Sequence, residues 1–305
     1  MAKKKILFTG GSGLLALNWA LLPADAYDVV LGLHKKNISV NNLVTMIIDM
    51  ETITGFSAVL ENIKPDIVIH CAGLANVEAC EADPSMAYHV NVELSVNVAG
   101  ACKMHGIHFV YISTDHLFSG KKALVSEDEI PSPVNEYGKT KLEAEKKILE
   151  ISDRFLSIRT NFYGWGPAYR QSFSDMIITN IRNKKPVSLF EDFYYTPILI
   201  EELGYTVMEL VSKHANGIFN VTGNERISKS VFGNRVADRF GLDKSLIRIS
   251  KFSERKDLVK RPADLSLSNK KVCTFLNREV GNIDANIEKL FLQEKTGFSN
   301  IIQNV

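Results

Sequence analysis

The chain has 305 residues, of which 45% are hydrophobic and 23% are charged, and its formal net charge is +1. This is the composition of an ordinary globular protein, and a charge so close to zero creates no overall field that would attract nucleic acid or acidic lipid. No run of 18 apolar residues appears, so the sequence predicts no membrane span. The four cysteines show no metal-binding spacing, and we expect free thiols in a reducing cytoplasm.

A glycine-rich turn follows the first predicted strand, residues 4–9. It reads Gly10-Gly11-Ser12-Gly13-Leu14-Leu15-Ala16 and leads into an apolar helix that ends at about Leu22. Small residues at Gly10, Gly13 and Ala16 let the backbone approach a pyrophosphate, and the start of the helix adds N–H groups and positive potential. The alternative is a glycine turn without a ligand, but the position between a strand and a helix favours a dinucleotide site.

A basic tip ends the second predicted strand, residues 28–33. A dinucleotide fold usually has an acidic residue here to bind ribose hydroxyls, whereas this chain has His34-Lys35-Lys36. Together with Ser12, this tip suits a ribose phosphate, so NADP(H) is favoured over NAD(H); the alternative is a solvated turn. The third predicted strand, 45–48, ends at Asp49-Met50, where an adenine edge would lie.

The fourth predicted strand and the helix after it are strongly apolar. Residues 65–73 have the composition of a parallel strand that is covered on both faces, and the small Ala72 and Gly73 leave room for a cofactor. The helix at 84–104 is apolar around much of its circumference, which indicates burial on two sides. We therefore predict that it packs on the sheet and also on a second subunit, giving a homodimer, with Asn91 as a buried amide.

The fifth predicted strand, 108–113, runs into Thr114 and Asp115. In open parallel sheets ligands sit at the carboxyl ends of the strands, so both side chains should face the same crevice as Ala72 and Gly73. A hydroxyl at Thr114 could donate a hydrogen bond to a carbonyl oxygen there. A turn without function would be the better interpretation if the next helix carried no reactive group.

That next helix, predicted at 135–150, carries a tyrosine and a lysine one turn apart. Tyr137, Lys141, Ala144 and Ile148 share one narrow stripe, because positions three and four apart lie on the same face. A partly desolvated Lys141 ammonium would lower the pKa of Tyr137 and make it a proton donor or acceptor near neutral pH. The alternative is an ordinary surface helix with a chance Tyr-x-x-x-Lys.

The C-terminal half has a less regular pattern. We predict strands near 154–159, 187–190, 196–200 and 217–222, and helices near 171–183, 201–213, 229–240 and 284–294, the last being the final helix. Phe190, Tyr194 and Tyr195 could line a base or sugar pocket, although packing in a core is the more common fate of aromatic residues.

These elements predict an α/β fold, a Rossmann-type doubly wound parallel sheet with a smaller C-terminal α/β substrate lobe. The dinucleotide-binding domain is expected at 1–165 and the substrate lobe at 166–305. Segments near 195–225 are expected to return to the first domain.

Several motifs together resemble the extended short-chain dehydrogenase/reductase family. They are the glycine turn with Thr9 before it, Cys71-Ala72-Gly73, Asn91, Ser113-Thr114-Asp115 and Tyr137-Gly138-Lys139-Thr140-Lys141. Further stretches resemble its dTDP-4-dehydrorhamnose reductase branch, namely Ala75–Glu81, Ile112–Gly120, Thr196-Pro197 and Arg261-Pro262.

The resemblance implies roles for individual residues. Tyr137 would protonate the carbonyl oxygen, Lys141 would lower its pKa and hold the nicotinamide ribose, and Thr114 would hydrogen-bond the carbonyl. The residues expected at the cofactor are Gly10, Ser12, Gly13, Leu14, Leu15, His34, Lys35, Asp49, Met50, Cys71, Ala72, Gly73, Tyr137 and Lys141. The residues expected at the substrate are Asp115, His116, Asn161 and Arg261.

Two departures from the branch concern substrate choice, since His116 stands where Tyr is usual and Ser119 where Asp is frequent. Related dehydratases carry an Asp-Glu pair where this chain has Asp115-His116, so elimination of a hydroxyl lacks its second carboxylate. The resulting hypothesis is an NADPH-dependent reductase of a nucleotide-linked 4-keto-6-deoxysugar. The alternatives are a non-catalytic regulatory subunit, resembling that of methionine adenosyltransferase, and a sugar-nucleotide epimerase.

Overall fold

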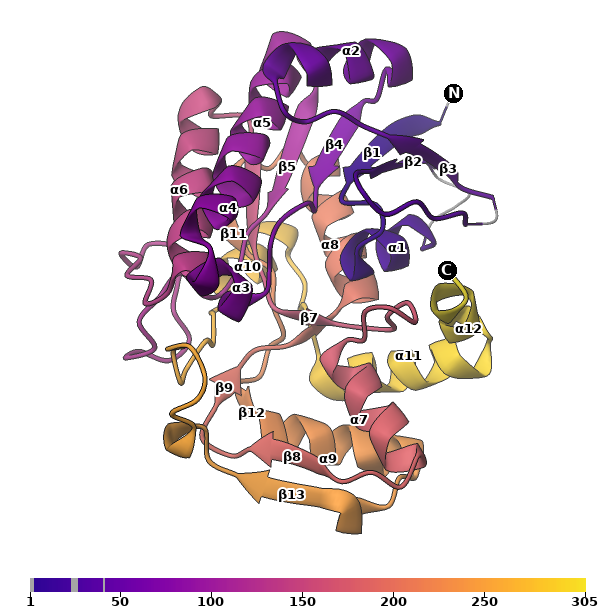
Figure 1. Ribbon diagram of the computed structural model, residues 1–305, viewed down its shortest axis with the longest axis vertical. Helices are drawn as coiled ribbons and strands as arrows, with labels where there is room; N and C mark the ends of the chain where they lie inside the picture. Colours follow the sequence, from indigo (N-terminus) through magenta and orange to yellow (C-terminus); the bar gives the residue numbers. More distant parts are fainter. Residues whose placement is uncertain (1–2, 23–26, 41) are drawn as a thin grey trace.

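The centre of the protein is a seven-stranded sheet, in a computed structural model that describes residues 3–22, 27–40 and 42–305. All neighbouring strands are parallel, in the order β11-β6-β5-β4-β1-β2-β3 (Figure 1). The strands are β1 (Lys4–Thr9), β2 (Tyr27–Leu33), β3 (Val44–Ile47), β4 (Ile67–His70), β5 (His108–Ile112), β6 (Leu156–Arg159) and β11 (Gly217–Asn220). The predicted Rossmann-type sheet is thereby confirmed, and its order reverses between β1 and β4, where such folds bind ligands.

Helices cover both faces of this sheet. One face carries α2 (Ile53–Ile63), α5 (Leu94–Met104) and α6 (Glu136–Ile151), and the other carries α1 (Leu14–Ala20) and α8 (Ile200–Ser212). Alternate residues of the inner strands enter the two cores, so in β1 Leu7 packs under α5 while Ile6 and Phe8 pack under α1. These inner strands read as apolar runs because both of their faces are buried, whereas the edge strand β3 is largely exposed. None of the described helices is long and apolar enough to cross a membrane.

The predicted helix at 84–104 is interrupted. It consists of α4 (Pro84–Tyr88), a π-helical turn at His89–Glu93, and α5. Asn91 lies in that turn, fully buried; its amide donates to the Leu74 carbonyl and the Thr140 hydroxyl and accepts from the Leu74 N–H. Helix α5 packs between α2 and α6, so its apolar circumference is covered within one chain and does not require a second subunit.

The C-terminal lobe lies beyond the carboxyl ends of the sheet strands (Figure 1). Its short strands pair in twos: β7 (Phe162–Tyr163) with β10 (Ile198–Leu199), β8 (Val187–Phe190) with β13 (Ile247–Ser250), and β9 (Tyr194–Tyr195) with β12 (Ile227–Ser228). Its helices are α7 (Phe173–Arg182), α9 (Lys229–Phe240) and α11 (Ile283–Lys295). Within the range predicted to return to the first domain, α8 packs on α1 and β11 extends the central sheet.

The sequence missed several helices, and the helix predicted at 284–294 is present as α11 but is not the last of the chain. A further helix, α12 (Phe298–Gln303), follows α11 after Gly297, whose φ is +82°. Six residues are too few to show a helical period, and only Ser299 and Ile302 of α12 are buried. The other helices not predicted are α2, α3 (Val77–Ala82) and α10 (Lys270–Leu276).

A buried ion pair ties α6 to β6. Arg159 and Glu145 have side chains that are only 2% exposed, the guanidinium nitrogen Nη2 lies 2.6 Å from Oε1, and Ser157 donates to Oε2 at 2.8 Å. Removal of one partner leaves the other charge buried and unpaired, so Glu145→Ala should destabilise the protein by about 3–5 kcal/mol. The free energy of unfolding in urea measures this loss. The exposed Glu143→Ala on the same helix is the control, and an equal effect of both variants would contradict the expectation.

Candidate active site

Two adjoining pockets form one groove across the carboxyl ends of β1, β4 and β5. The first has a volume of about 240 Å³ and reaches from Gly13 to Tyr137 and Lys141. The second has a volume of about 380 Å³ and reaches from Gly10 to His34 and Met50. The residues that line both are Gly13, Cys71, Ala72, Gly73 and Arg170. The groove therefore has the extended form that a dinucleotide needs, and apart from Arg170 the residues at its middle are small.

The glycine turn is shaped by close backbone contacts. Gly10 has a φ of +67°, and a Cβ on it would lie 2.8 Å from Cα of Ala72, while a Cβ on Gly13 would lie 3.0 Å from the Gly10 carbonyl oxygen. Only glycine fits the first position, because both the positive φ and the neighbouring chain exclude a side chain. This turn thus packs directly on the residues after β4 and fits a pyrophosphate lying against its backbone.

The basic tip lies at the far end of the groove, with some but not all of the residues that were expected there. His34 and Lys36 line the second pocket, together with Ser12 and the buried Met50. Lys35 lines neither pocket, and neither does Asp49, whose carboxylate accepts a hydrogen bond from the Glu51 N–H. Lys36 instead lies with Nζ 3.0 Å from the ring centroid of Tyr169, a residue of the C-terminal lobe.

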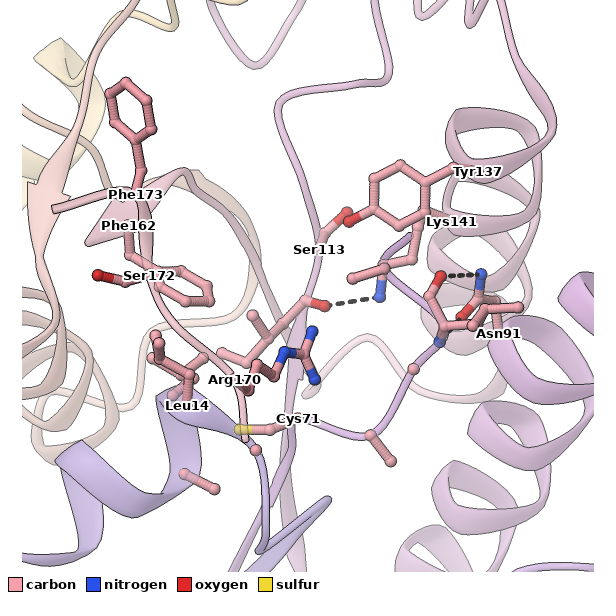
Figure 2. Close-up of a pocket in the computed structure, with 18 of the residues that line it drawn as sticks. Leu14, Cys71, Asn91, Ser113, Tyr137, Lys141, Phe162, Arg170, Ser172 and Phe173 are labelled. Atoms are coloured by element: carbon pink, nitrogen blue, oxygen red, sulfur yellow. Dashed lines mark hydrogen bonds between the residues drawn. The ribbon is translucent and has the colours of Figure 1, made fainter. Parts of the chain in front are cut away.

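The tyrosine and the lysine stand at the other end of the groove, on α6. Asn135 caps this helix by accepting from the Gly138 N–H at 2.9 Å, and so fixes the turn that carries Tyr137. The ring of Tyr137 points into the first pocket (Figure 2). Lys141 is 5% exposed; its ammonium donates to the Ile112 carbonyl at 2.8 Å and lies 4.0 Å from the ring centroid of Tyr111. The other lysines of this helix are exposed or half-buried.

The expected lowering of the tyrosine pKa is absent from this structure. Burial raises the pKa of Tyr137 to about 12, and the nearby Thr114 hydroxyl only partly offsets this. Burial also lowers the pKa of Lys141 to about 7, so its positive charge is itself unfavourable in the pocket. The predicted direction was wrong because the Lys141 ammonium was taken as partly desolvated but still charged, and the desolvation of the Tyr137 phenol itself was left out.

Polar residues that follow β5 and β6 gather beside the phenol of Tyr137. Asn161 donates to Asp115 Oδ2 at 2.6 Å, Thr114 donates to Oδ1 at 3.3 Å, and the ring of His116 meets that of Tyr137 edge-on at 5.3 Å. Burial raises the pKa of Asp115 to about 6, against the effect of the Asn161 hydrogen bond. Burial, with the charges of Arg261 and Lys229, lowers the pKa of His116 to about 3, so this imidazole is neutral.

Two cationic side chains lie near this cluster, Arg261, which the sequence identified, and Lys229, which it missed. Arg261, the expected substrate cation, pairs with Glu78, its Nη2 lying 2.5 and 2.6 Å from the two carboxylate oxygens. Lys229, at the start of α9, lies with Nζ 3.6 Å from the ring centroid of Tyr195 and 4.3 Å from that of Phe173. Burial lowers the pKa of Lys229 to about 7, although the Asp115 charge acts against this. Only the fold brings Lys229 near Asp115, so no local motif could have identified it.

The sequence also missed the segment between β7 and α7. Tyr169 and Arg170 of this segment lie at the groove, and no motif in the sequence indicated a role for either residue. No group of three or more His, Cys, Asp or Glu residues in the described part of the chain is arranged to hold a metal ion.

Three features define the class of protein: the parallel sheet with its reversal of strand order, the glycine turn after its first strand, and the Tyr-x-x-x-Lys pair in the same groove. Together they are those of a short-chain dehydrogenase/reductase. A family model described as the RmlD substrate binding domain matches residues 4–294. The chain belongs to this family, and the resemblance to the dTDP-4-dehydrorhamnose reductase branch is confirmed.

Similar proteins include reductases and a subunit of methionine adenosyltransferase. The probable low-salt glycan biosynthesis reductase Agl14 of Haloferax volcanii is 28% identical over 207 residues, 67% of this chain and 69% of that protein. Methionine adenosyltransferase 2 subunit beta of Mus musculus is 26% identical over 254 residues, 80% of this chain and 75% of that protein. The dTDP-4-dehydrorhamnose reductase of Bacillus anthracis, solved in complex with NADP, superposes with a TM-score of 0.84 at 23% identity, covering 96% of this chain and all of that one.

Proposed function

We propose that the protein is an NADPH-dependent oxidoreductase that reduces the keto group of a nucleotide-linked 4-keto-6-deoxysugar. The observation that carries this proposal is the groove itself, which has the glycine cradle at its middle and Tyr137 and Lys141 at one end. The reductases among the similar proteins support the same reaction class.

In this proposal the residues of the chain bind the cofactor, orient the keto group of the substrate and protonate its oxygen. The bound cofactor supplies a hydride to the carbonyl carbon. Tyr137 donates its phenolic proton to the carbonyl oxygen; with a pKa near 12 the phenol is fully protonated at neutral pH, as a donor must be. Thr114 orients the carbonyl oxygen, and Lys141 holds the nicotinamide ribose. The neutral His116 closes one side of Tyr137 and limits the access of water.

The substrate lies on the lobe side of Tyr137 in this proposal. Asp115, Asn161 and His116 surround the sugar, and Lys229 and Arg261 provide positive charge near it. Two buried atoms of this region, Arg261 Nε and His116 Nδ1, have no hydrogen-bond partner within the described residues, and a sugar or phosphate oxygen would suit the arginine.

The cofactor preference rests on the second pocket. His34 and Lys36 line it, and among its described lining residues there is no aspartate or glutamate to bind the ribose hydroxyls of NAD(H). We expect NADPH to bind at least about tenfold more tightly than NADH, because a phosphate gains charge-assisted hydrogen bonds that a hydroxyl does not. Fluorescence titration with both reduced cofactors measures the ratio. Equal affinities would refute the preference while leaving the fold unaffected.

Two other functions compete with the reductase. A regulatory subunit is favoured by the similarity to methionine adenosyltransferase 2 subunit beta, and it would bind the dinucleotide without turnover. An epimerase would need the cofactor to take a hydride from the sugar and return it to the same sugar, so it would show no net NADPH oxidation. Following NADPH absorbance with a panel of nucleotide 4-ketosugars distinguishes the reductase from the other two functions, and analysis of the sugar products then separates an epimerase from a regulatory subunit. A homodimer is part of the proposal, with the exposed Met86 and Tyr88 of α4 as the surface available to a second copy.

A further inference from the structure

The short segment at 166–172, which we call the strap, leaves the lobe and returns to it with both ends held firmly. Gly166 and Ser172 both donate backbone N–H groups to Oδ2 of Asp175, at 2.5 and 3.0 Å. Just before the strap, Asn18 of α1 donates to the Trp165 carbonyl at 2.5 Å. A Cβ on Gly166 would collide with the Arg170 carbonyl oxygen, so the strap folds back tightly on itself. Its conformation is therefore set by its anchors.

The middle of the strap crosses the groove. The Tyr169 hydroxyl donates to the Ser12 carbonyl at 2.8 Å, and the ring of Tyr169 packs on Lys36. One side chain of the lobe thus touches both the glycine turn and the basic tip, which are the two parts of the first domain that the sequence assigned to the cofactor.

Arg170 stands at the point that both pockets share. It lines each of them together with Gly13 and Gly73, and Figure 2 shows its guanidinium pointing into the groove near Cys71. It is exposed, and it forms no salt bridge with a carboxylate of the described residues. A guanidinium offers five donors in a planar fork that matches phosphate oxygens.

We propose that Arg170 is a cofactor-binding residue that holds the pyrophosphate from the side opposite the glycine turn, with Tyr169 positioning it across the groove. The glycine turn provides close backbone approach but no positive side chain at this point, since Lys36 and Lys141 lie toward the two ends of the groove. Arg170 supplies that charge. The inference rests on the dinucleotide site of the proposed function but not on the identity of the sugar.

The test compares ligands that do and do not contain a pyrophosphate. Arg170→Gln should weaken NADPH and NADH equally, by about 10- to 100-fold, as expected when a charge-assisted contact to phosphate is lost. Adenosine 2′-phosphate has no pyrophosphate, and its affinity should change less than about twofold. Tyr169→Phe removes only a neutral hydrogen bond to Ser12 and should weaken NADPH by about 2- to 10-fold. Dissociation constants come from calorimetric titration.

Matched variants control for charge and folding. Lys185→Gln removes one exposed positive charge from the lobe, far from both pockets, and should leave every affinity unchanged. Arg170→Lys should restore part of the affinity, because the charge is kept and the fork is lost. Unchanged NADPH binding by Arg170→Gln, or an equal loss of adenosine 2′-phosphate binding, would overturn the inference alone. Failure of the unaltered protein to bind any dinucleotide would overturn the inference together with the proposed function.

Discussion

Tyr137→Phe is expected to lower kcat by a factor on the order of 10² to 10⁴, the usual contribution of general acid catalysis. The variant keeps the ring that packs edge-on against His116 and loses only the hydroxyl. Folding and NADPH affinity should therefore stay close to those of the unaltered protein. Steady-state kinetics with the accepted ketosugar and a cofactor titration measure the two effects separately.

Tyr205→Phe is the matched control for this variant. Tyr205 lies on α8, is 46% exposed, and lines neither pocket, so the loss of its hydroxyl should leave kcat unchanged. If Tyr137→Phe kept full turnover, the proton donor would have to be another group. If neither the unaltered protein nor the variant turned over while both bound NADPH, the regulatory subunit would be the better account.

The parts of the fold that the sequence predicted well are those determined locally. Apolar strands and the glycine turn between β1 and α1 have short-range patterns, and so does the one-turn spacing of Tyr137 and Lys141. The position of the groove follows from the general rule that ligands lie at the carboxyl ends of parallel strands. These features required no knowledge of which distant segments come together.

The features that the sequence missed depend on packing between distant segments. Arg159 looked like an ordinary strand end, yet it is buried against Glu145 of α6. The strap carries no local motif that indicates a site, because its contact with Ser12 spans 157 positions of the chain. The pKa of Tyr137 was predicted in the wrong direction, because spacing gives the neighbours of a group but not the degree to which it is desolvated.

Lys141 illustrates how function can conflict with stability at such a site. Its ammonium is 95% buried and has no carboxylate within salt-bridge distance among the described residues, and only one carbonyl accepts from it. Burial of an unpaired charge costs free energy, and this cost is what lowers the pKa of Lys141 to about 7. A residue kept under such conditions is a candidate for a functional role, and the role that we propose for Lys141 is to hold the nicotinamide ribose.

Lys141→Met should therefore have opposite effects on activity and on stability. We expect turnover and NADPH binding to fall by at least about 10-fold each, because the ammonium that serves the ribose is gone. We expect the free energy of unfolding at pH 6 to rise, by an amount on the order of a few kcal/mol, because an apolar side chain of similar length replaces a buried charge. Lys139→Met is the control; that side chain is 57% exposed, pairs with Glu136, and should change neither property appreciably.

The pH dependence gives this prediction a sign that can be checked. The folded pKa of Lys141, about 7, lies below its usual value of 10.5, so the unfolded chain binds the extra proton between these values. The free energy of unfolding of the unaltered protein therefore carries no penalty from Lys141 above pH 10.5. It decreases as the pH falls from 10.5 to 7, and below pH 7 the full penalty is present. The stability advantage of Lys141→Met should thus be largest below pH 7 and should shrink progressively toward pH 10. Thermal unfolding of both proteins at pH 6 and pH 9 measures the difference. An advantage that is constant with pH, or a variant that unfolds more easily at pH 6, would show that Lys141 is not a buried, disfavoured charge.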